Sequence, residues 1–244
     1  MKAMVLAAGM GTRLKPLTDS IPKALVEVGG IPMLERVVLN LKKQGFEKIV
    51  INVHHFGNKI QEFLSGKEFG VTIQVSDESK ELLDTGGGIV KAFDLLFNED
   101  SSPVLIHNVD ILSNADLRAL MENCVDRKEG PSLLVSDRDS SRKLIFDSKM
   151  RLIGWHNLKD NAYRWVATQE DKEKELAFSG IYSITRESVA EIKRIMGGGK
   201  YSIMEYFLNS ERKISVKGFE QKELRIIDIG KPATLLQASK IYKD

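Results

Sequence analysis

The alternation of strand-length apolar runs with helical patterns in the first half of the chain constrains its fold most strongly. The apolar runs are bounded by polar residues or glycine and lie at residues 2–8, 48–54, 71–77 and 102–110. Segments with apolar side chains at helical spacing lie between them, at residues 32–45, 58–66 and 88–97. Strands and helices in this order form right-handed crossovers and a mostly parallel sheet with helices on both faces. The sequence therefore predicts an α/β, Rossmann-like fold.

The second half of the chain predicts additional, mixed strands. Strand-like runs lie at residues 132–139, 143–155, 177–185, 214–220 and 224–230, and helical patterns lie at 186–196, 202–211 and 231–243. The polar and charged segment 157–176 predicts a loop or a short excursion from the sheet. Because no linker, repeat or low-complexity stretch interrupts the sequence, we expect a single domain over residues 1–244, with an N-terminal half of about 1–115 and a C-terminal half of about 116–244.

Composition limits the class of protein. The 42% of hydrophobic residues suffices for a packed core, and 36 basic against 34 acidic residues argue against a nucleic-acid-binding coat. The single cysteine, Cys124, excludes an internal disulfide framework and suits a reducing compartment, and we expect it to be a structural residue of a helix. No run approaches the ~18 apolar residues of a membrane span, and the N-terminal run is too short for a signal peptide. We therefore expect a cytoplasmic protein with no nucleic-acid, membrane or obligatory protein partner.

The loop after the first strand, "LAAGMGTRLKPLT" (6–18), concentrates glycine and basic residues. Gly9 and Gly11 allow backbone N–H groups to approach an anion, and the Arg13 guanidinium suits phosphate. A lone Gly-x-Gly is also typical of a plain tight turn. A dinucleotide-binding fingerprint is disfavoured because Leu14 replaces its third glycine, a proline soon follows, and the second strand lacks a terminal acidic residue. A P-loop is excluded because no Gly-Lys-Ser/Thr follows.

Further polar clusters lie at the ends of predicted elements. Asp110 ends the strand 102–110, where an Asp often only caps the next element. The segment "DTGGG" (84–88) is typical of a flexible turn before a helix. His54 and His55 are adjacent at a strand end, so their side chains point to opposite faces and do not easily share one metal ion. We expect structural or loop-contact roles for both histidines.

Together, these segments resemble a known enzyme family. "LAAGMGTRLKPLT" followed by "PKALVEVGGIPML" resembles the signature of the sugar-phosphate nucleotidyltransferases, and the resemblance continues through "LLDTGGGIVKAF", "LIHNVD", "FSGIYSI" and "IIDIGKPATLLQA". It covers essentially the whole chain and is closest to short, single-domain members similar to N-acetylmuramate-1-phosphate uridylyltransferase. It implies Mg²⁺-dependent nucleotidyl transfer from an NTP to a sugar 1-phosphate, with release of pyrophosphate. The hexapeptide repeats of the β-helix in acetylating members are absent from this sequence, so we expect no β-helix domain and one activity.

The resemblance implies that the N-terminal half binds the nucleotide and the C-terminal half the sugar. Arg13 and Lys23 are the implied catalytic residues: Arg13 is expected at the departing β- and γ-phosphates, and Lys23 at the α-phosphate. Lys15 is expected to be a solvated surface residue. The resemblance implies a nucleotide site made of Ala8, Gly9, Gly11, Thr12, Arg13, Lys23, Thr85 and Gly86, in which the last two hold the base or ribose.

The resemblance also implies a metal site and a sugar site. Asp110 and Asp228 end two strands and are expected to hold Mg²⁺ together with phosphate and water oxygens. Asn108 is expected to contact the sugar or the ribose. Ser179 and Gly180 are expected to contact the sugar, although a glycine here is also typical of a bulge within a strand.

The sequence departs from the family pattern at the sugar phosphate, because it has neither a Glu-Lys-Pro nor a Gly-Asp-Phe element. In "SSRKLIFD" (140–147), Arg142 and Lys143 either neutralise the sugar phosphate or are exposed charges. Uridylyl transfer to N-acetylmuramate 1-phosphate or a related sugar phosphate is favoured. Guanylyl transfer to mannose or heptose 1-phosphate and cytidylyl transfer to phosphocholine stay open. A regulatory module that binds a nucleotide without turnover is disfavoured because Arg13, Lys23, Asp110 and Asp228 are all present. A dinucleotide oxidoreductase is disfavoured.

Overall fold

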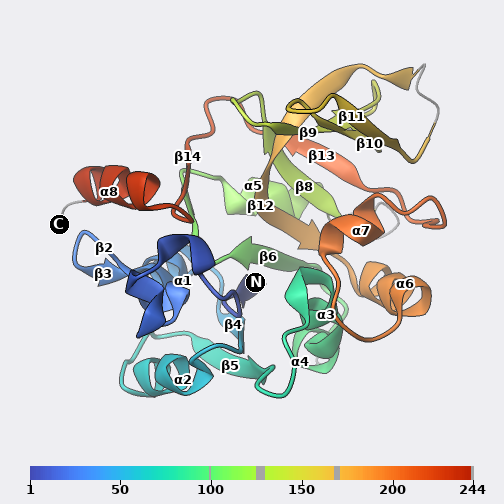
Figure 1. Ribbon diagram of the computed structural model, residues 1–244. Coiled ribbons are helices and arrows are strands. Elements are labelled where there is room, and N and C mark those ends of the chain that lie inside the picture. Colours follow the sequence, from blue (N-terminus) through green and yellow to red (C-terminus); the bar gives the residue numbers. More distant parts are fainter. Residues whose placement is uncertain (99, 125–129, 168–170, 243–244) are drawn as a thin grey trace.

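A ten-stranded sheet forms the centre of the molecule (Figure 1). The computed structural model describes residues 1–98, 100–124, 130–167 and 171–242. Eight strands of the sheet follow one another in the spatial order β11 (Ala162–Trp165), β10 (Leu152–Asn157), β9 (Arg142–Phe146), β12 (Lys174–Ile184), β6 (Val104–Asn108), β1 (Lys2–Leu6), β4 (Lys48–Val53) and β5 (Thr72–Asp77). Two more strands, β8 (Ser132–Ser136) on β12 and β13 (Lys217–Glu220) on β8, complete it. The prediction of a mixed α/β sheet is confirmed.

The N-terminal strands of this sheet are parallel, as the alternation of strands and helices predicts. β1 is buried along its whole length and pairs with β4 on one side and β6 on the other. In this register, Leu6 lies beside both Asn52 and Asn108. The loops that follow the three strands therefore share one edge of the sheet, which is where ligands bind in open α/β folds.

The C-terminal strands are antiparallel around β12, and here two sequence predictions are wrong. Residues 143–155 form the pair β9–β10 instead of one strand, because the Asp147 carboxylate closes a turn between them. It accepts hydrogen bonds from the backbone N–H groups of Lys149 (2.9 Å) and Arg151 (2.8 Å). Residues 157–176, predicted as a loop, contain β11 and the start of β12.

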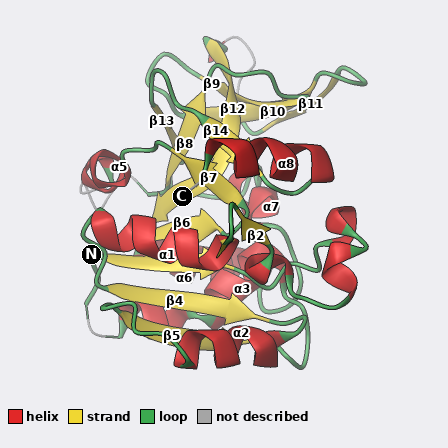
Figure 2. Ribbon diagram, turned by 90° about the vertical axis from the view of Figure 1, so that its left-hand side faces the viewer, coloured by secondary structure: helices red, strands yellow, loops and turns green. Residues whose placement is uncertain are grey.

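Helices cover both faces of the sheet, as predicted (Figure 2). One apolar core contains residues of α1 (Met33–Lys43), α2 (Gly57–Ser65), α5 (Leu117–Asn123) and α8 (Pro232–Ile241). The other contains residues of α3 (Asp84–Lys91), α4 (Phe93–Phe97), α6 (Arg186–Met196) and α7 (Ile203–Phe207). Cys124 is buried at the C-cap of α5, in line with its predicted structural role. No described helix has the length and apolar character needed to cross a membrane.

The glycine segment 84–88 is a further correction. It is not a turn before a helix over 88–97 but the first part of α3, which ends at Lys91. A Cβ on Gly86 would lie 2.4 Å from Cε2 of Tyr201, so the helix needs glycine to pack against the segment before α7. Glycine lowers helix propensity by about 1 kcal/mol, and tertiary packing overrides that preference here.

Two short antiparallel pairs lie outside the central sheet. One joins β2 (Glu27–Val28) to β3 (Ile31–Pro32), and the other joins β7 (Ile111–Ser113) to β14 (Ile226–Asp228). The second pair matters for the site, because β7 follows β6 closely and β14 comes from the far end of the chain. Asp228 lies opposite Ile111 in this pair.

Candidate active site

A first cavity, of about 490 Å³, opens at the sheet edge where β1, β4 and β6 end. Leu6, Asn52 and Asn108 line it from the ends of these strands. Of the residues predicted from the sequence, its lining includes Ala8, Gly9, Arg13, Lys23, Thr85, Asn108 and Asp110. The parallel register therefore brings together side chains that lie as much as a hundred residues apart in the sequence.

The loop after β1 forms one wall of the first cavity. Gly11 has φ 66°, in the left-handed region that favours glycine, and it precedes a short helical turn, Thr12–Leu14. The Thr18 hydroxyl donates to the Gly11 carbonyl (2.8 Å), and a Cβ on residue 11 would lie 3.0 Å from Cβ of Lys23. Gly11 therefore lets the returning Pro-Lys segment pack against the loop. Gly11 and Thr12 are not in the lining of the cavity, and their contact with a nucleotide stays a prediction.

The predicted catalytic and metal-binding side chains lie close together. Lys23 and Asp110 form an ion pair, with side chains only 12% and 15% exposed. The Asp110 carbonyl accepts a hydrogen bond (2.8 Å) from the backbone N–H of the residue after Asp228, which holds β14 beside it. A Cβ on Gly230 would lie 2.5 Å from Nη2 of Arg13 and 2.7 Å from Oδ1 of Asp228, so these two side chains are neighbours.

The Asp110 and Asp228 carboxylates are the candidate ligands for a divalent metal ion. Asp110 uses Oδ2 in its ion pair, and Asp228 uses Oδ1 to accept from the Gly230 N–H (2.7 Å), so each retains a second oxygen. Among residues 1–98, 100–124, 130–167 and 171–242, no three His, Cys, Asp or Glu side chains cluster as a metal site. Mg²⁺ typically takes one or two carboxylates and completes its shell with phosphate and water oxygens. Asp110 and Asp228 are carboxylates of the kind that such a site uses.

A buried pair that the sequence analysis missed supports the first cavity. Asn52 accepts a hydrogen bond from the Ala7 N–H (2.7 Å) and donates to Glu78 Oε1 (2.7 Å), while Glu78 Oε2 accepts from the Leu83 N–H (3.2 Å). Burial raises the pKa of Glu78. His54 Nδ1 lies 2.7 Å from the Glu78 carbonyl oxygen, which agrees with a structural role. The Asn52–Glu78 pair thus links the loop after β1 to Leu83, which precedes α3. In the sequence, the one sign of this pair was Asn52, a polar residue inside an apolar strand.

The segment before α7 closes another side of the first cavity. The Gly86 N–H donates to the Tyr201 carbonyl (2.9 Å), and the Thr85 hydroxyl accepts from the Ile203 N–H (2.9 Å). Gly86 therefore serves close packing, and its predicted contact with the nucleotide stays untested, whereas Thr85 does line the cavity. Lys200, which follows three glycines, also lines it and was missed by the sequence analysis.

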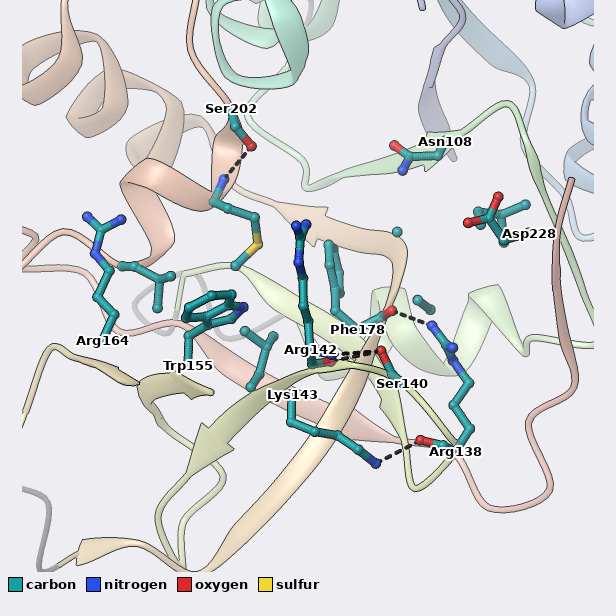
Figure 3. Close-up of a pocket in the computed structure, with 16 residues that line it drawn as sticks. Asn108, Arg138, Ser140, Arg142, Lys143, Trp155, Arg164, Phe178, Ser202 and Asp228 are labelled. Carbon is teal, nitrogen blue, oxygen red and sulfur yellow. Dashed lines mark hydrogen bonds between the residues drawn. The ribbon is translucent and has the colours of Figure 1, made fainter. Parts of the chain in front are cut away.

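A second cavity, of about 580 Å³, adjoins the first at Asn108, which lines both (Figure 3). The predicted residues Ser179, Gly180 and Asp228 line it. Gly180 has φ 77° at an irregularity in β12, and a Cβ there would lie 2.7 Å from Nδ2 of Asn108. The glycine thus allows the Asn108 amide to approach β12. The Ser179 hydroxyl accepts a hydrogen bond from the backbone N–H two residues later (3.1 Å), so it also stabilises this bulge.

The second cavity is rich in cations. Its basic residues are Arg138, Arg142, Lys143 and Arg164. Trp155 is on β10, which lies between β9, the strand of Arg142 and Lys143, and β11, the strand of Arg164. Arg138 donates to the Phe178 carbonyl (2.9 Å); burial lowers its pKa, and nearby Asp228 opposes that shift. Both residues that the sequence offered for the sugar phosphate, Arg142 and Lys143, are in the lining. Arg138, Trp155 and Arg164 were missed, the last because β11 was expected to be a loop.

The sequence matches the Nucleotidyl transferase family over residues 2–143. The N-acetylmuramate alpha-1-phosphate uridylyltransferase of Neisseria meningitidis is 42% identical over 123 residues, which are 50% of this chain and 52% of the relative. The enzyme of the same name from Caulobacter vibrioides is 42% identical over 111 residues, which are 44% of this chain and 45% of the relative. Mannose-1-phosphate guanylyltransferase 1 of Arabidopsis thaliana is 31% identical over 144 residues, 59% of this chain and 40% of the relative. The matched segments thus span about half of these relatives' length or less.

Solved structures share the whole fold. HddC from Yersinia pseudotuberculosis, complexed with GMP-PN, superposes with a TM-score of 0.78 at 22% identity, covering 99% of both chains. A putative glucose-1-phosphate thymidylyltransferase from Bacillus anthracis, in complex with a sucrose, superposes with a TM-score of 0.78 at 23% identity, covering 100% of this chain and 96% of the other. At such identities the likeness shows the fold alone. The family match over more than half of the sequence, on a fold shared along the entire chain, shows that this protein belongs to the Nucleotidyl transferase family.

Proposed function

We propose that this protein transfers a nucleotidyl group from an NTP to a sugar 1-phosphate, with UTP as donor and N-acetylmuramate 1-phosphate as acceptor. The observation that carries the proposal is the meeting of two cavities at Asn108. One combines a glycine-rich loop with Arg13, Lys23 and Asp110, and the other is cationic and lined by an aromatic ring. The choice of UTP and of this acceptor is supported by the 42% identity with two N-acetylmuramate alpha-1-phosphate uridylyltransferases.

The proposed reaction needs charge neutralisation and positioning more than covalent catalysis. An oxygen of the sugar phosphate bonds to the α-phosphorus as the bond to the oxygen that bridges the α- and β-phosphates breaks. Pyrophosphate leaves with that oxygen and its electron pair, and the product is an NDP-sugar. Two anions must approach each other, so cations that hold both in line supply much of the rate enhancement.

The residues divide this work between them. Arg13 and the backbone of Gly9 would bind the β- and γ-phosphates that depart, and Lys23 would lie at the α-phosphate, where Asp110 orients its ammonium group. Asn108 would contact the acceptor from its place between the cavities. Asp110 and Asp228 would hold Mg²⁺, which when bound neutralises phosphate oxygens.

A panel of substrate pairs tests this proposal. Pyrophosphate release is measured with each of UTP, GTP, CTP, dTTP and ATP against a set of sugar 1-phosphates and phosphocholine, with and without MgCl₂. We expect release with UTP and N-acetylmuramate 1-phosphate to exceed all other pairs and to require Mg²⁺. Release with another pair would correct the substrates but keep the reaction. Nucleotide binding without release from any pair would overturn the proposal in favour of a regulatory module.

A further inference from the structure

In the proposed reaction, the phosphate of the acceptor must lie where the two cavities meet, next to the nucleotide. Asn108 marks this junction, because it lines both cavities. The sequence has no Glu-Lys-Pro element to supply a cation for the sugar phosphate. A phosphate that approaches a triphosphate needs a cation of its own, since repulsion between the two anions opposes their approach. The basic residues of the second cavity are the candidates for this cation.

Two of these basic residues are already engaged within the protein. Lys143 donates to the Arg138 carbonyl (2.7 Å) and forms an ion pair with Asp137 (3.3 Å). Its ammonium group points away from the junction of the cavities in Figure 3. Arg138 donates through Nη2 to the Phe178 carbonyl (2.9 Å) and through Nη1 to the Asp139 carbonyl (3.3 Å). Both side chains therefore stabilise the loop between β8 and β9 and its contact with β12.

The other two basic residues, Arg142 and Arg164, lie on opposite sides of Trp155. Trp155 pairs with Arg164 on β11 and with Leu144 on β9, so these three side chains share one face of the sheet. Arg142 lies two residues before Leu144 and is on the same face. In Figure 3, Arg164 is on the far side of the indole ring from Asn108, and Arg142 is on the near side. The indole ring thus separates Arg164 from the junction of the cavities.

Arg142 is anchored through its backbone, and its side chain extends into the second cavity. The Ser140 hydroxyl donates to the Arg142 carbonyl (2.9 Å) and accepts from the Arg142 N–H (3.3 Å). Within the parts of the chain that the structure describes, the guanidinium group has no hydrogen-bond or ion-pair partner. It lies between Trp155 and Asn108 (Figure 3). Strand β9 therefore presents an unpaired set of donors to the junction from a fixed base.

We propose that Arg142 binds the phosphate of the acceptor sugar and fills the role that the missing Glu-Lys-Pro element leaves open. The inference rests on the proposed function, because it assigns a ligand to the acceptor of that reaction. A planar guanidinium group donates two parallel hydrogen bonds to phosphate oxygens, which both neutralises the phosphate and fixes its orientation. Arg13 and Lys23 line the first cavity, so separate cations serve the nucleotide and the acceptor.

Calorimetric titration of two matched sugars tests the inference. N-acetylmuramate 1-phosphate and N-acetylmuramate differ only in the phosphate, and each is titrated into the protein with a non-hydrolysable UTP analogue and Mg²⁺ present. A charge-assisted bidentate pair predicts that the wild-type protein binds the phosphorylated sugar about 10- to 100-fold more tightly. Arg142→Gln should lower this ratio about tenfold, and Arg142→Lys should retain part of it, since lysine keeps the charge but not the fork.

Arg225→Gln is the matched control, because Arg225 is an exposed arginine that lines neither cavity. It should keep the wild-type ratio. An unchanged ratio in Arg142→Gln would overturn the inference, and a ratio lost in Lys143→Gln instead would assign the phosphate to the neighbouring cation. An equal loss of affinity for both sugars in Arg142→Gln would also overturn it, because Arg142 would then contact the part that the two sugars share.

Pyrophosphate release with UTP and N-acetylmuramate 1-phosphate tests the proposed function separately. An Arg142→Gln protein that turns over with an unchanged KM for the acceptor would overturn the inference and leave nucleotidyl transfer intact. Loss of the phosphate preference in Arg142→Gln, in a protein whose wild type releases no pyrophosphate, would keep the phosphate-binding role and overturn the proposed function. Binding of neither sugar to the wild-type protein would overturn the inference together with the proposed acceptor.

Discussion

The two cavities differ in how the chain builds them. The first is made by loops that directly follow parallel strands, so short motifs such as residues 6–18 supply most of its lining. The second is made by antiparallel strand pairing over residues 142–184, which alternates side chains between two faces. The course of the backbone in these loops shapes the first cavity, whereas the side chains on the paired strands shape the second. Under the proposed function, the transfer reaction belongs to the first cavity and the choice of acceptor to the second.

The largest effect is expected at Asp110, in the first cavity. Asp110→Asn should lower the rate of pyrophosphate release about 1,000-fold, because it removes the charge that pairs with Lys23 and a candidate metal ligand. The fold should persist, since the amide is nearly isosteric with the carboxylate. Steady-state kinetics and a thermal melt measure both. Asp19→Asn, which changes an exposed carboxylate paired with Lys15, is the control and should retain full activity. Full activity of Asp110→Asn would remove this residue from the metal site.

A smaller effect, confined to the first cavity, is expected when the buried Glu78 beneath that cavity is replaced. Glu78→Ala leaves the Asn52 amide and the Leu83 N–H without their acceptor and should lower the free energy of unfolding by about 2 kcal/mol. The KM for the NTP should rise more than the KM for the acceptor, because Asn52 anchors the loop after β1.

The pH dependence of this variant has a definite sign. Burial raises the pKa of Glu78 above its usual 4.5, so the folded state favours the protonated form. The stability that comes from this shift is present at low pH and is lost as the pH rises through the raised pKa. Denaturant unfolding should therefore show a difference between wild type and Glu78→Ala that widens as the pH is lowered toward 4. If the difference in unfolding free energy between the two proteins narrowed as the pH was lowered toward 4, burial of Glu78 would not be the cause of the pH dependence.

The smallest effect is expected in the second cavity. Gly180→Ala places a Cβ at φ 77° and within 2.7 Å of Nδ2 of Asn108. The strain should lower the free energy of unfolding by about 1 kcal/mol, and displacement of the Asn108 amide should raise the KM for the acceptor. The KM for the NTP should change little, in contrast to Glu78→Ala. If both variants raised the same KM, the division of labour between the cavities would be wrong.

The sequence predicted the first cavity far better than the second. Lys23 and Asp110 were predicted from motifs that follow strands, and the parallel pairing of β1 with β6 brings the two loops that carry them together. The α/β fold was likewise readable from the alternation of strands and helices. What local patterns could not supply was the partner of each motif, such as the packing of Tyr201 that makes residues 84–88 helical.

The errors in the second half share a physical cause. The turn between β9 and β10 has no glycine; the Asp147 side chain and Met150, with φ 59°, form it instead. Strand β11, with the sequence "AYRW", pairs only at the edge of the sheet and shows no clear alternation of apolar and polar residues. It forms a hairpin with β10, in which Asn157 pairs with Ala162. Because this hairpin and its register were not predicted, Trp155 and Arg164 could not be assigned to one face from the sequence.

The most direct measurement is a crystal structure of the protein with a non-hydrolysable UTP analogue, Mg²⁺ and N-acetylmuramate 1-phosphate. We expect the triphosphate in the first cavity beside Arg13 and Lys23, the metal on Asp110 and Asp228, and the sugar in the second cavity, with Asn108 between them. A triphosphate bound elsewhere, or a metal that contacts neither aspartate, would contradict the division of the site between a nucleotide cavity and an acceptor cavity.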